Sequence, residues 1–152
     1  MKKLIFVCTG NTCRSPMAEG LMKKLLPPEN GWRIASAGVF AGAGFPVSPN
    51  AVAALKEKGI DISAHRSQPL TEKLISGADL LIAMTRGHLD SILQLAPQSS
   101  GKVFLLKSFG SAELAADIDD PAGEALGVYR HVRDEIDAAL PDLIIYMLEE
   151  RK

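Results

Sequence analysis

Residues 4–16 of this chain read LIFVCTGNTCRSP, and they contain the transition that decides the fold. The first four, 4–7, are apolar and rich in β-formers, as in a strand that is buried on both faces. Small and polar residues then end the apolar run. Ser15 and Pro16 suit the start of a helix, with Ser15 as its N-cap and Glu19 at the spacing of a capping box. The stretch therefore predicts a strand, a short loop and a helix.

The rest of the chain alternates between apolar runs and helical periodicity. Further strands are predicted at 32–37, 79–84 and 102–106, and helices at 50–59, from 71, at 87–95 and from 124 onward, with a long polar loop at 108–123. The last helix carries an apolar stripe that runs from Val128 to Met147, and Pro141 is expected to kink or split it. This alternation predicts an α/β fold, with one domain over 1–152. Its four-stranded parallel sheet carries helices on both faces, in the flavodoxin-like three-layer arrangement.

Composition excludes several function classes. Seventeen basic and eighteen acidic side chains give a net charge of -1, so no broad basic surface for nucleic acid or anionic membrane is expected. Two cysteines do not make a secreted disulfide scaffold and favour a reducing compartment. The apolar start is too short for a signal peptide, and no run approaches the ~18 residues of a membrane span. We therefore expect a cytoplasmic protein.

The loop after the first strand suits a phosphoryl group. Ligands of parallel sheets bind beyond the carboxyl ends of the strands, where this loop must lie. Backbone amides of a tight loop and the following helix N-terminus attract anions, and the Arg14 guanidinium adds a planar fork. The candidate phosphate-binding residues are Thr9, Gly10, Asn11, Thr12, Cys13, Arg14 and Ser15.

Cys8 is the candidate nucleophile. The same positive surroundings are expected to lower the pKa of its thiol, into a range of roughly 3.5–7.5. The Ser15 hydroxyl is placed to hydrogen-bond the sulfur, and the Asn11 side chain to hold a strained turn. Cys13 has two interpretations: a packing residue, or the partner of Cys8 in a disulfide that protects the nucleophile from over-oxidation.

An attacking thiolate needs an acid for the leaving group and later a base for water. Asp120 is our candidate for both roles, because Pro121 directly after it fixes the backbone of its loop. The competing interpretation is that this acidic loop is only a solvated surface. Of the three histidines, His65 is expected to hold backbone groups, and His88 and His131 to lie on the surface of helices.

With these residues in hand, the chain resembles the low-molecular-weight protein tyrosine phosphatases over nearly its whole length. The matching motifs are residues 7–16, Asp120-Pro121 and, in support, Ser36-Ala37-Gly38 and His65-Arg66-Ser67. The resemblance implies a phosphocysteine intermediate on Cys8, a phosphoryl group bound by Arg14, and Asp120 as acid and then base. It also implies a monomer that acts on phosphorylated proteins and needs no metal or other cofactor.

Thr12 refines the expected substrate. Phosphotyrosine-specific members usually carry an aliphatic residue here, whereas Thr12 presents a hydroxyl to a polar substrate head. The segments at 38–45 and 66–74 also resemble the bacterial protein arginine phosphatases. Thr12 and Asp120 are therefore the predicted specificity residues, and phosphoarginine the predicted substrate. Ala122 stands where the family commonly has an aromatic residue, so Phe40 or Phe45 is a candidate for that wall of the site.

Three further functions stay open at this point. The first is that of a phosphotyrosine phosphatase of the same family. The second is that of an arsenate reductase of similar fold, which passes oxidation along later cysteines that are missing after Cys13. The third is that of a non-catalytic module that binds phosphate or senses oxidation through Cys8 and Cys13, which would have no need of an acid at Asp120.

Overall fold

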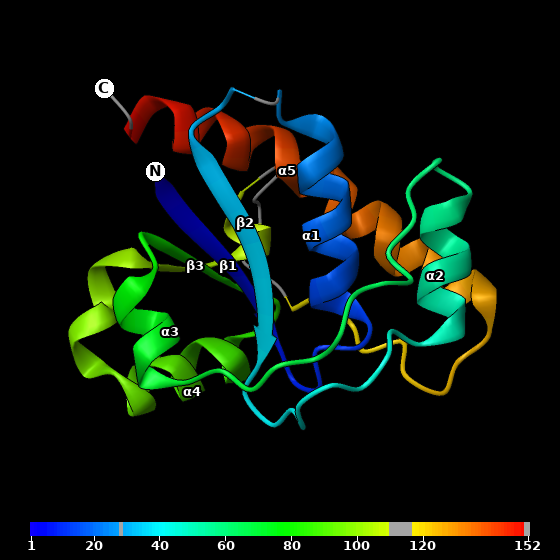
Figure 1. Ribbon diagram of the computed structural model, residues 1–152, viewed down its shortest axis with the longest axis horizontal. Coiled ribbons are helices and arrows are strands. Elements are labelled where there is room, and N and C mark those ends of the chain that lie inside the picture. The colour runs from blue at the N-terminus through cyan, green and yellow to red at the C-terminus, as the bar shows by residue number, and fades with distance from the viewer. Residues whose placement is uncertain (28, 110–116, 151–152) are drawn as a thin grey trace.

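The first strand, β1 (Lys2–Cys8), lies inside a four-stranded sheet whose order is β2-β1-β3-β4. A computed structural model describes residues 1–27, 29–109 and 117–150 (Figure 1). The other strands are β2 (Trp32–Gly38), β3 (Leu80–Ala83) and β4 (Val103–Leu105). All three pairings are parallel. The predicted sheet is confirmed in strand number and direction.

Helices connect the strands in the predicted places. They are α1 (Arg14–Leu25), α2 (Pro49–Lys56), α3 (Glu72–Gly77), α4 (Arg86–Leu95) and α5 (Leu126–Glu150), with short 3-10 helices η1 (Pro97–Lys102) and η2 (Leu106–Ser108). Thr71 is the N-cap of α3, because its hydroxyl accepts a hydrogen bond from the Leu74 amide. Residues 110–116 of the predicted long loop lie outside the described part of the chain.

The helices form a layer on each face of the sheet. The side chains of Leu4 and Phe6 pack into a core that includes buried residues of α1, α2 and α5. Those of Ile5 and Val7 join a second core with buried residues of α3 and α4. Figure 1 shows these two helices on the other side of the sheet from α1. All four side chains are fully buried, which explains the continuous apolar run of β1.

The last helix departs from its prediction at two positions. It continues as one helix across Pro141, so the split, one of the two predicted outcomes, does not occur. Pro141 is exposed, and it has no amide hydrogen for the carbonyl one turn before it. Val128 is also exposed, whereas Tyr129 on the next position is buried, so the inward face of the helix starts one residue later than predicted. Within the described residues, no helix combines the length and apolar character needed to cross a membrane.

Candidate active site

A cavity of about 210 Å³ opens where β1 ends at the carboxyl edge of the sheet. Its lining consists of Cys8, Thr9, Gly10, Thr12, Cys13, Arg14, Asp120 and Ala122. The fold thus brings Asp120 to the loop that carries Cys8, although more than a hundred residues separate them in the sequence. The predicted cradle residues Asn11 and Ser15 do not line the cavity. They are fully buried behind the loop.

Ser15 is a partner of the nucleophile and not a helix cap. Helix α1 already begins at Arg14, and its N-cap residue is Cys13, whose side chain makes no capping hydrogen bond. The Ser15 hydroxyl oxygen instead lies 2.8 Å from Cys8 Sγ and accepts a hydrogen bond from the Asn11 amide at 2.8 Å. The predicted capping box is therefore wrong: contacts with the loop occupy the serine, and Glu19 stands four positions after Ser15, one more than a capping box has.

Asn11 holds the loop in a strained conformation. It is the one non-glycine residue of the described chain with a positive φ, 59°, where its short polar side chain bonds locally. Its side-chain nitrogen, Nδ2, donates to the hydroxyls of Ser15 and Ser36. Its side-chain oxygen, Oδ1, accepts from the Gln68 backbone amide at 3.0 Å. The predicted role of Asn11 in a strained turn is confirmed by this geometry.

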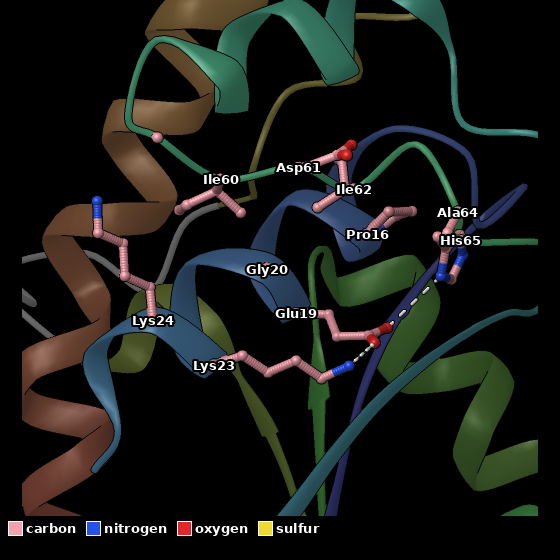
Figure 2. A pocket seen from close by; sticks show the side chains of 11 residues that line it. Pro16, Glu19, Gly20, Lys23, Lys24, Ile60, Asp61, Ile62, Ala64 and His65 are labelled. Atoms are coloured by element: carbon pink, nitrogen blue, oxygen red, sulfur yellow. Dashed lines mark hydrogen bonds and ion pairs between the residues drawn. The ribbon is translucent and has the colours of Figure 1, made fainter. Parts of the chain in front are cut away.

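The network continues from Asn11 to the side chain of Glu19. Ser36 Oγ donates to Glu19 Oε1 at 2.6 Å, and Glu19 also pairs with Lys23 and faces His65 (Figure 2). His65 Nε2 lies 3.3 Å from the Asn11 backbone carbonyl oxygen and 3.2 Å from Asn11 Oδ1, and the first contact confirms that His65 holds backbone groups. Glu19 and His65 line a second cavity of about 650 Å³ between α1 and residues 59–65.

These contacts identify the donor and the acceptor of each hydrogen bond from Glu19 to Cys8. An ionised Glu19 only accepts, so Ser36 donates to it and accepts from Asn11. Asn11 uses its other amide hydrogen on Ser15, so the Ser15 hydroxyl hydrogen is left for Cys8 Sγ. The network therefore ends in a donor to sulfur, which favours a thiolate.

Arg14 connects the loop to the segment that carries Asp120. Its guanidinium is buried, and the residue is 5% exposed. Nη1 donates to the carbonyl of Ile118 at 2.9 Å, and Nη2 donates to the Thr9 hydroxyl at 3.3 Å. Asp120 Oδ2 lies 3.8 Å from Nη2 at the mouth of the cavity. Positive charge at the base and an exposed carboxylate at the rim suit an anion that carries a leaving group.

The carboxylates of Asp117 and Asp120 make different contacts, and only that of Asp120 is near the cavity. Asp117 points away from the site, because its carboxylate caps α4 by accepting from the Arg86 amide at 2.8 Å. Asp120 Oδ1 accepts from the Ala122 amide at 3.0 Å, and its side chain is about half exposed. Asp120 is thus available to a substrate.

The pKa of the Cys8 thiol departs from the prediction in its direction. Burial raises the pKa of the Cys8 thiol in the free protein and outweighs the hydrogen bonds of Ser15 and the charge of Arg14, which lower it. The expected net lowering is therefore wrong for the free protein. The contacts with Ser15 and Arg14 that lower the pKa are present, but their effect is smaller than the effect of removing the sulfur from water.

Close packing holds the loop against β2. A Cβ atom on Gly38 would lie 2.3 Å from the Thr9 carbonyl oxygen and 3.0 Å from the Asn11 backbone nitrogen. The glycine therefore permits an approach between backbones that a side chain would prevent. This gives the Ser36-Ala37-Gly38 match a physical role.

His88 lies inside the fold, so its predicted place on the surface is wrong. The residue is 5% exposed. Its Nε2 lies 2.7 Å from Thr9 Oγ1 and its Nδ1 lies 3.0 Å from Thr85 Oγ1. Helical position alone gave no signal for this contact, since Thr9 and His88 are 79 positions apart.

Cys13 and the phenylalanines complete the surroundings. Cys13 is buried and free, with Sγ 3.3 Å from Ser48 Oγ and 3.5 Å from the Tyr129 hydroxyl. It therefore packs in the core and also lines the cavity.

Phe40 and Phe45 are 87% and 59% exposed, and neither lines the cavity. Neither phenylalanine therefore replaces the aromatic side chain that is missing at Ala122 in the free protein.

Comparisons with known proteins agree with this geometry. The family model described as low molecular weight phosphotyrosine protein phosphatase matches residues 3–152. A protein-arginine-phosphatase of Geobacillus stearothermophilus is 46% identical over 142 residues, 93% of each chain. One of Bacillus subtilis strain 168 is 42% identical and covers 98% of this chain and 99% of its own.

A solved structure extends the comparison to the cavity. It is a YwlE arginine phosphatase in which serine replaces cysteine and the active-site serine is phosphorylated. The two chains superpose with a TM-score of 0.90 at 42% identity, over 98% of this chain and 97% of the other. From its sequence, fold and loop, this chain belongs to the low-molecular-weight phosphotyrosine protein phosphatase family.

Proposed function

We propose that this protein is a cysteine-dependent protein phosphatase that hydrolyses phosphoarginine through a phosphocysteine intermediate. Cys8 is the nucleophile, Arg14 binds the transferring phosphoryl group, and Asp120 is the acid and then the base. The observation that carries the proposal is the shared cavity: Asp120 lies 3.8 Å from Arg14 at the mouth of a pocket with Cys8 in its lining.

The reaction follows from these positions. The Cys8 thiolate attacks phosphorus, the phosphorus–nitrogen bond breaks, and the guanidine nitrogen takes a proton from Asp120. The ionised Asp120 then removes a proton from water, which attacks the phosphocysteine and releases phosphate and the thiolate. The Ser15 hydroxyl stabilises the thiolate at both stages, because its hydrogen is directed to the sulfur.

Two features support phosphoarginine over phosphotyrosine. Thr12 presents a hydroxyl at the wall of the cavity, and Asp120 is exposed at its rim, where it can pair with a guanidinium. The protein-arginine-phosphatases similar to this chain support the same substrate. The family's phosphotyrosine activity is the second candidate.

An arsenate reductase and a phosphate-binding module fit this site less well than a phosphatase. An arsenate reductase of this fold needs cysteines beyond the loop, and the chain has only Cys8 and Cys13. A module that only binds phosphate would not need a carboxylate at the mouth. A Cys8–Cys13 disulfide is compatible with a phosphatase and would switch it off.

The wider setting belongs to the same proposal. Residues 1–152 form one phosphatase domain that acts as a cytoplasmic monomer on phosphorylated proteins and needs no cofactor. It does not depend on nucleic acid or a membrane.

The test compares substrates and variants under reducing conditions. Peptides of one sequence, with phosphoarginine or phosphotyrosine at one position, are offered to the native protein and to Thr12→Ile and Cys8→Ser. We expect the native protein to prefer phosphoarginine and Thr12→Ile to shift toward phosphotyrosine. Preference of the native protein for phosphotyrosine would reject the arginine assignment. Activity that survives Cys8→Ser would reject the mechanism.

A further inference from the structure

The Thr9 side chain is held from two sides at the active-site cavity. Its hydroxyl oxygen accepts a hydrogen bond from Arg14 Nη2 at 3.3 Å. The same oxygen lies 2.7 Å from His88 Nε2. Thr9 lines the cavity, and His88 does not. The histidine therefore acts on the site only through the threonine and its neighbours.

The contacts of Thr85 indicate which ring nitrogen of His88 carries hydrogen. Thr85 Oγ1 accepts from the His88 backbone amide at 3.1 Å, as the cap of α4, and lies 3.0 Å from Nδ1. If Nδ1 is bare, the Thr85 hydroxyl donates to it, and the one hydrogen left over, that of the Thr9 hydroxyl, finds its acceptor in an anion bound in the cavity. The other tautomer would leave the Thr85 hydroxyl without an acceptor among the side-chain contacts of the described residues.

A bare Nδ1 places the ring hydrogen on Nε2, which then donates to Thr9 Oγ1. That oxygen has two lone pairs, and the donors from Arg14 and His88 occupy both. The hydrogen of the Thr9 hydroxyl must then point away from both donors, and Thr9 is a residue of the cavity lining.

We propose that His88 is a positioning residue that turns the Thr9 hydroxyl hydrogen into the cavity, where it donates to an oxygen of the bound phosphoryl group. The proposal rests on the phosphatase function, because it needs a phosphoryl group in the cavity. It adds a side-chain donor from Thr9 to the backbone amides and the Arg14 fork. This donor is aligned before the ligand arrives, which limits the cost of its reorientation.

Four single variants test the proposal in pairs. Thr9→Val removes the hydroxyl at nearly constant shape, and Thr9→Ser keeps it. His88→Leu removes the ring donor, and His88→Gln keeps an amide donor. We expect Thr9→Val and His88→Leu each to weaken binding of inorganic phosphate about tenfold and to lower kcat, and the two conservative variants to recover most of both. His131→Leu, at a histidine whose side chain is 72% exposed, is the matched control and should change neither quantity.

The double variant Thr9→Val with His88→Leu shows whether His88 acts through Thr9. If it does, the double variant binds phosphate no more weakly than Thr9→Val alone. Additive losses would overturn the proposal, as would unchanged phosphate affinity in Thr9→Val.

The tautomer is measured on the native protein, so this test does not depend on a variant that folds. Nitrogen-15 NMR should assign the hydrogen of the neutral His88 ring to Nε2, and a hydrogen on Nδ1 would overturn the proposal. A native protein that binds phosphate but hydrolyses neither phosphopeptide would reject the proposed function alone, since the tautomer and phosphate measurements would still decide the role of His88.

Discussion

Arg14 and Ile118 are joined by a buried hydrogen bond, in which the guanidinium donates to the backbone carbonyl at 2.9 Å. Ile118 is itself fixed to the sheet, because its amide donates to the carbonyl of Met84 at 2.9 Å. Asp120 follows two residues later in the same segment. The residue proposed to bind the phosphoryl group thus also holds the segment that carries the proposed acid.

This double role predicts that Arg14→Lys is not a conservative change. A lysine ammonium cannot bond Ile118 and a phosphoryl oxygen with the fixed fork of a guanidinium. We expect kcat to fall roughly 10²–10³-fold, as for loss of one donor to a reacting oxyanion. Steady-state kinetics on a phosphopeptide measures the loss. Arg130→Lys, at an exposed pair with Glu57, is the control. Equal kcat in both variants would contradict this role of Arg14.

Asp120→Asn should separate the acid from its neighbours. Asparagine keeps the shape but cannot supply a proton, so turnover of a phosphoarginine peptide should fall roughly 10²–10⁴-fold. The loss should be smaller with p-nitrophenyl phosphate, whose leaving group departs without a proton. Asp119→Asn, at an exposed position in the same segment, should leave both rates near those of the native protein. A similar loss for the two substrates would show that Asp120 acts otherwise.

Ser15→Ala should make Cys8 harder to ionise. The hydroxyl 2.8 Å from the sulfur lowers the pKa of the thiol, against the burial that raises it. Its removal should move the pH midpoint of Cys8 alkylation by iodoacetamide upward. Both proteins are measured in a Cys13→Ser background, so that only one thiol reacts. An unmoved midpoint would show that the serine supports the loop without acting on the sulfur.

The sequence predicted the sheet and the cavity because both depend on local patterns. The apolar run of β1, the breaks after it and the helical start at Pro16 lie within thirteen residues, and parallel sheets place such a loop at one edge. The Asp120-Pro121 match supplied the distant acid.

The errors at Ser15 and His88 come from side-chain contacts that the pattern along one helix does not show. Ser15 has the composition of a cap, but the loop folds back so that Asn11 and Cys8 occupy its hydroxyl. His88 has the position of a surface residue on α4, but β1 and β3 are neighbours in the sheet, and the ends of both strands bring Thr9 to it. Periodicity along one helix carries no information on such pairs.

Two substitutions at Asn11 separate the effect of its backbone strain on stability from the effect of its hydrogen bonds. Asn11→Ala removes the buried amide and leaves a Cβ at φ 59°, whereas Asn11→Gly removes the amide contacts and relieves the strain. We expect Asn11→Ala to lower the free energy of unfolding by about 2–4 kcal/mol. Asn11→Gly should be about 1 kcal/mol less harmful. Urea unfolding measures both, with Asn50→Ala as the surface control. If glycine is the more harmful, the strain is not significant.

The last prediction concerns the pH dependence of stability. Burial lowers the pKa of His88 to about 4, with a further lowering from Arg14 that Asp117 and Asp120 partly oppose. Between about pH 6.5 and 4 the unfolded chain therefore binds a proton at this position and the folded protein does not. Stability must fall as the pH falls through this window, by about 1–3 kcal/mol in total.

Urea unfolding at steps across this range measures the effect against variants. His88→Gln, which has no titrating ring, should show a flatter dependence by that amount. His131→Gln, whose ring is exposed, should keep the slope of the native protein. Parallel curves for the native protein and His88→Gln would mean that the ring gains its proton without loss of fold, and that the contact with Thr9 does not require a neutral histidine.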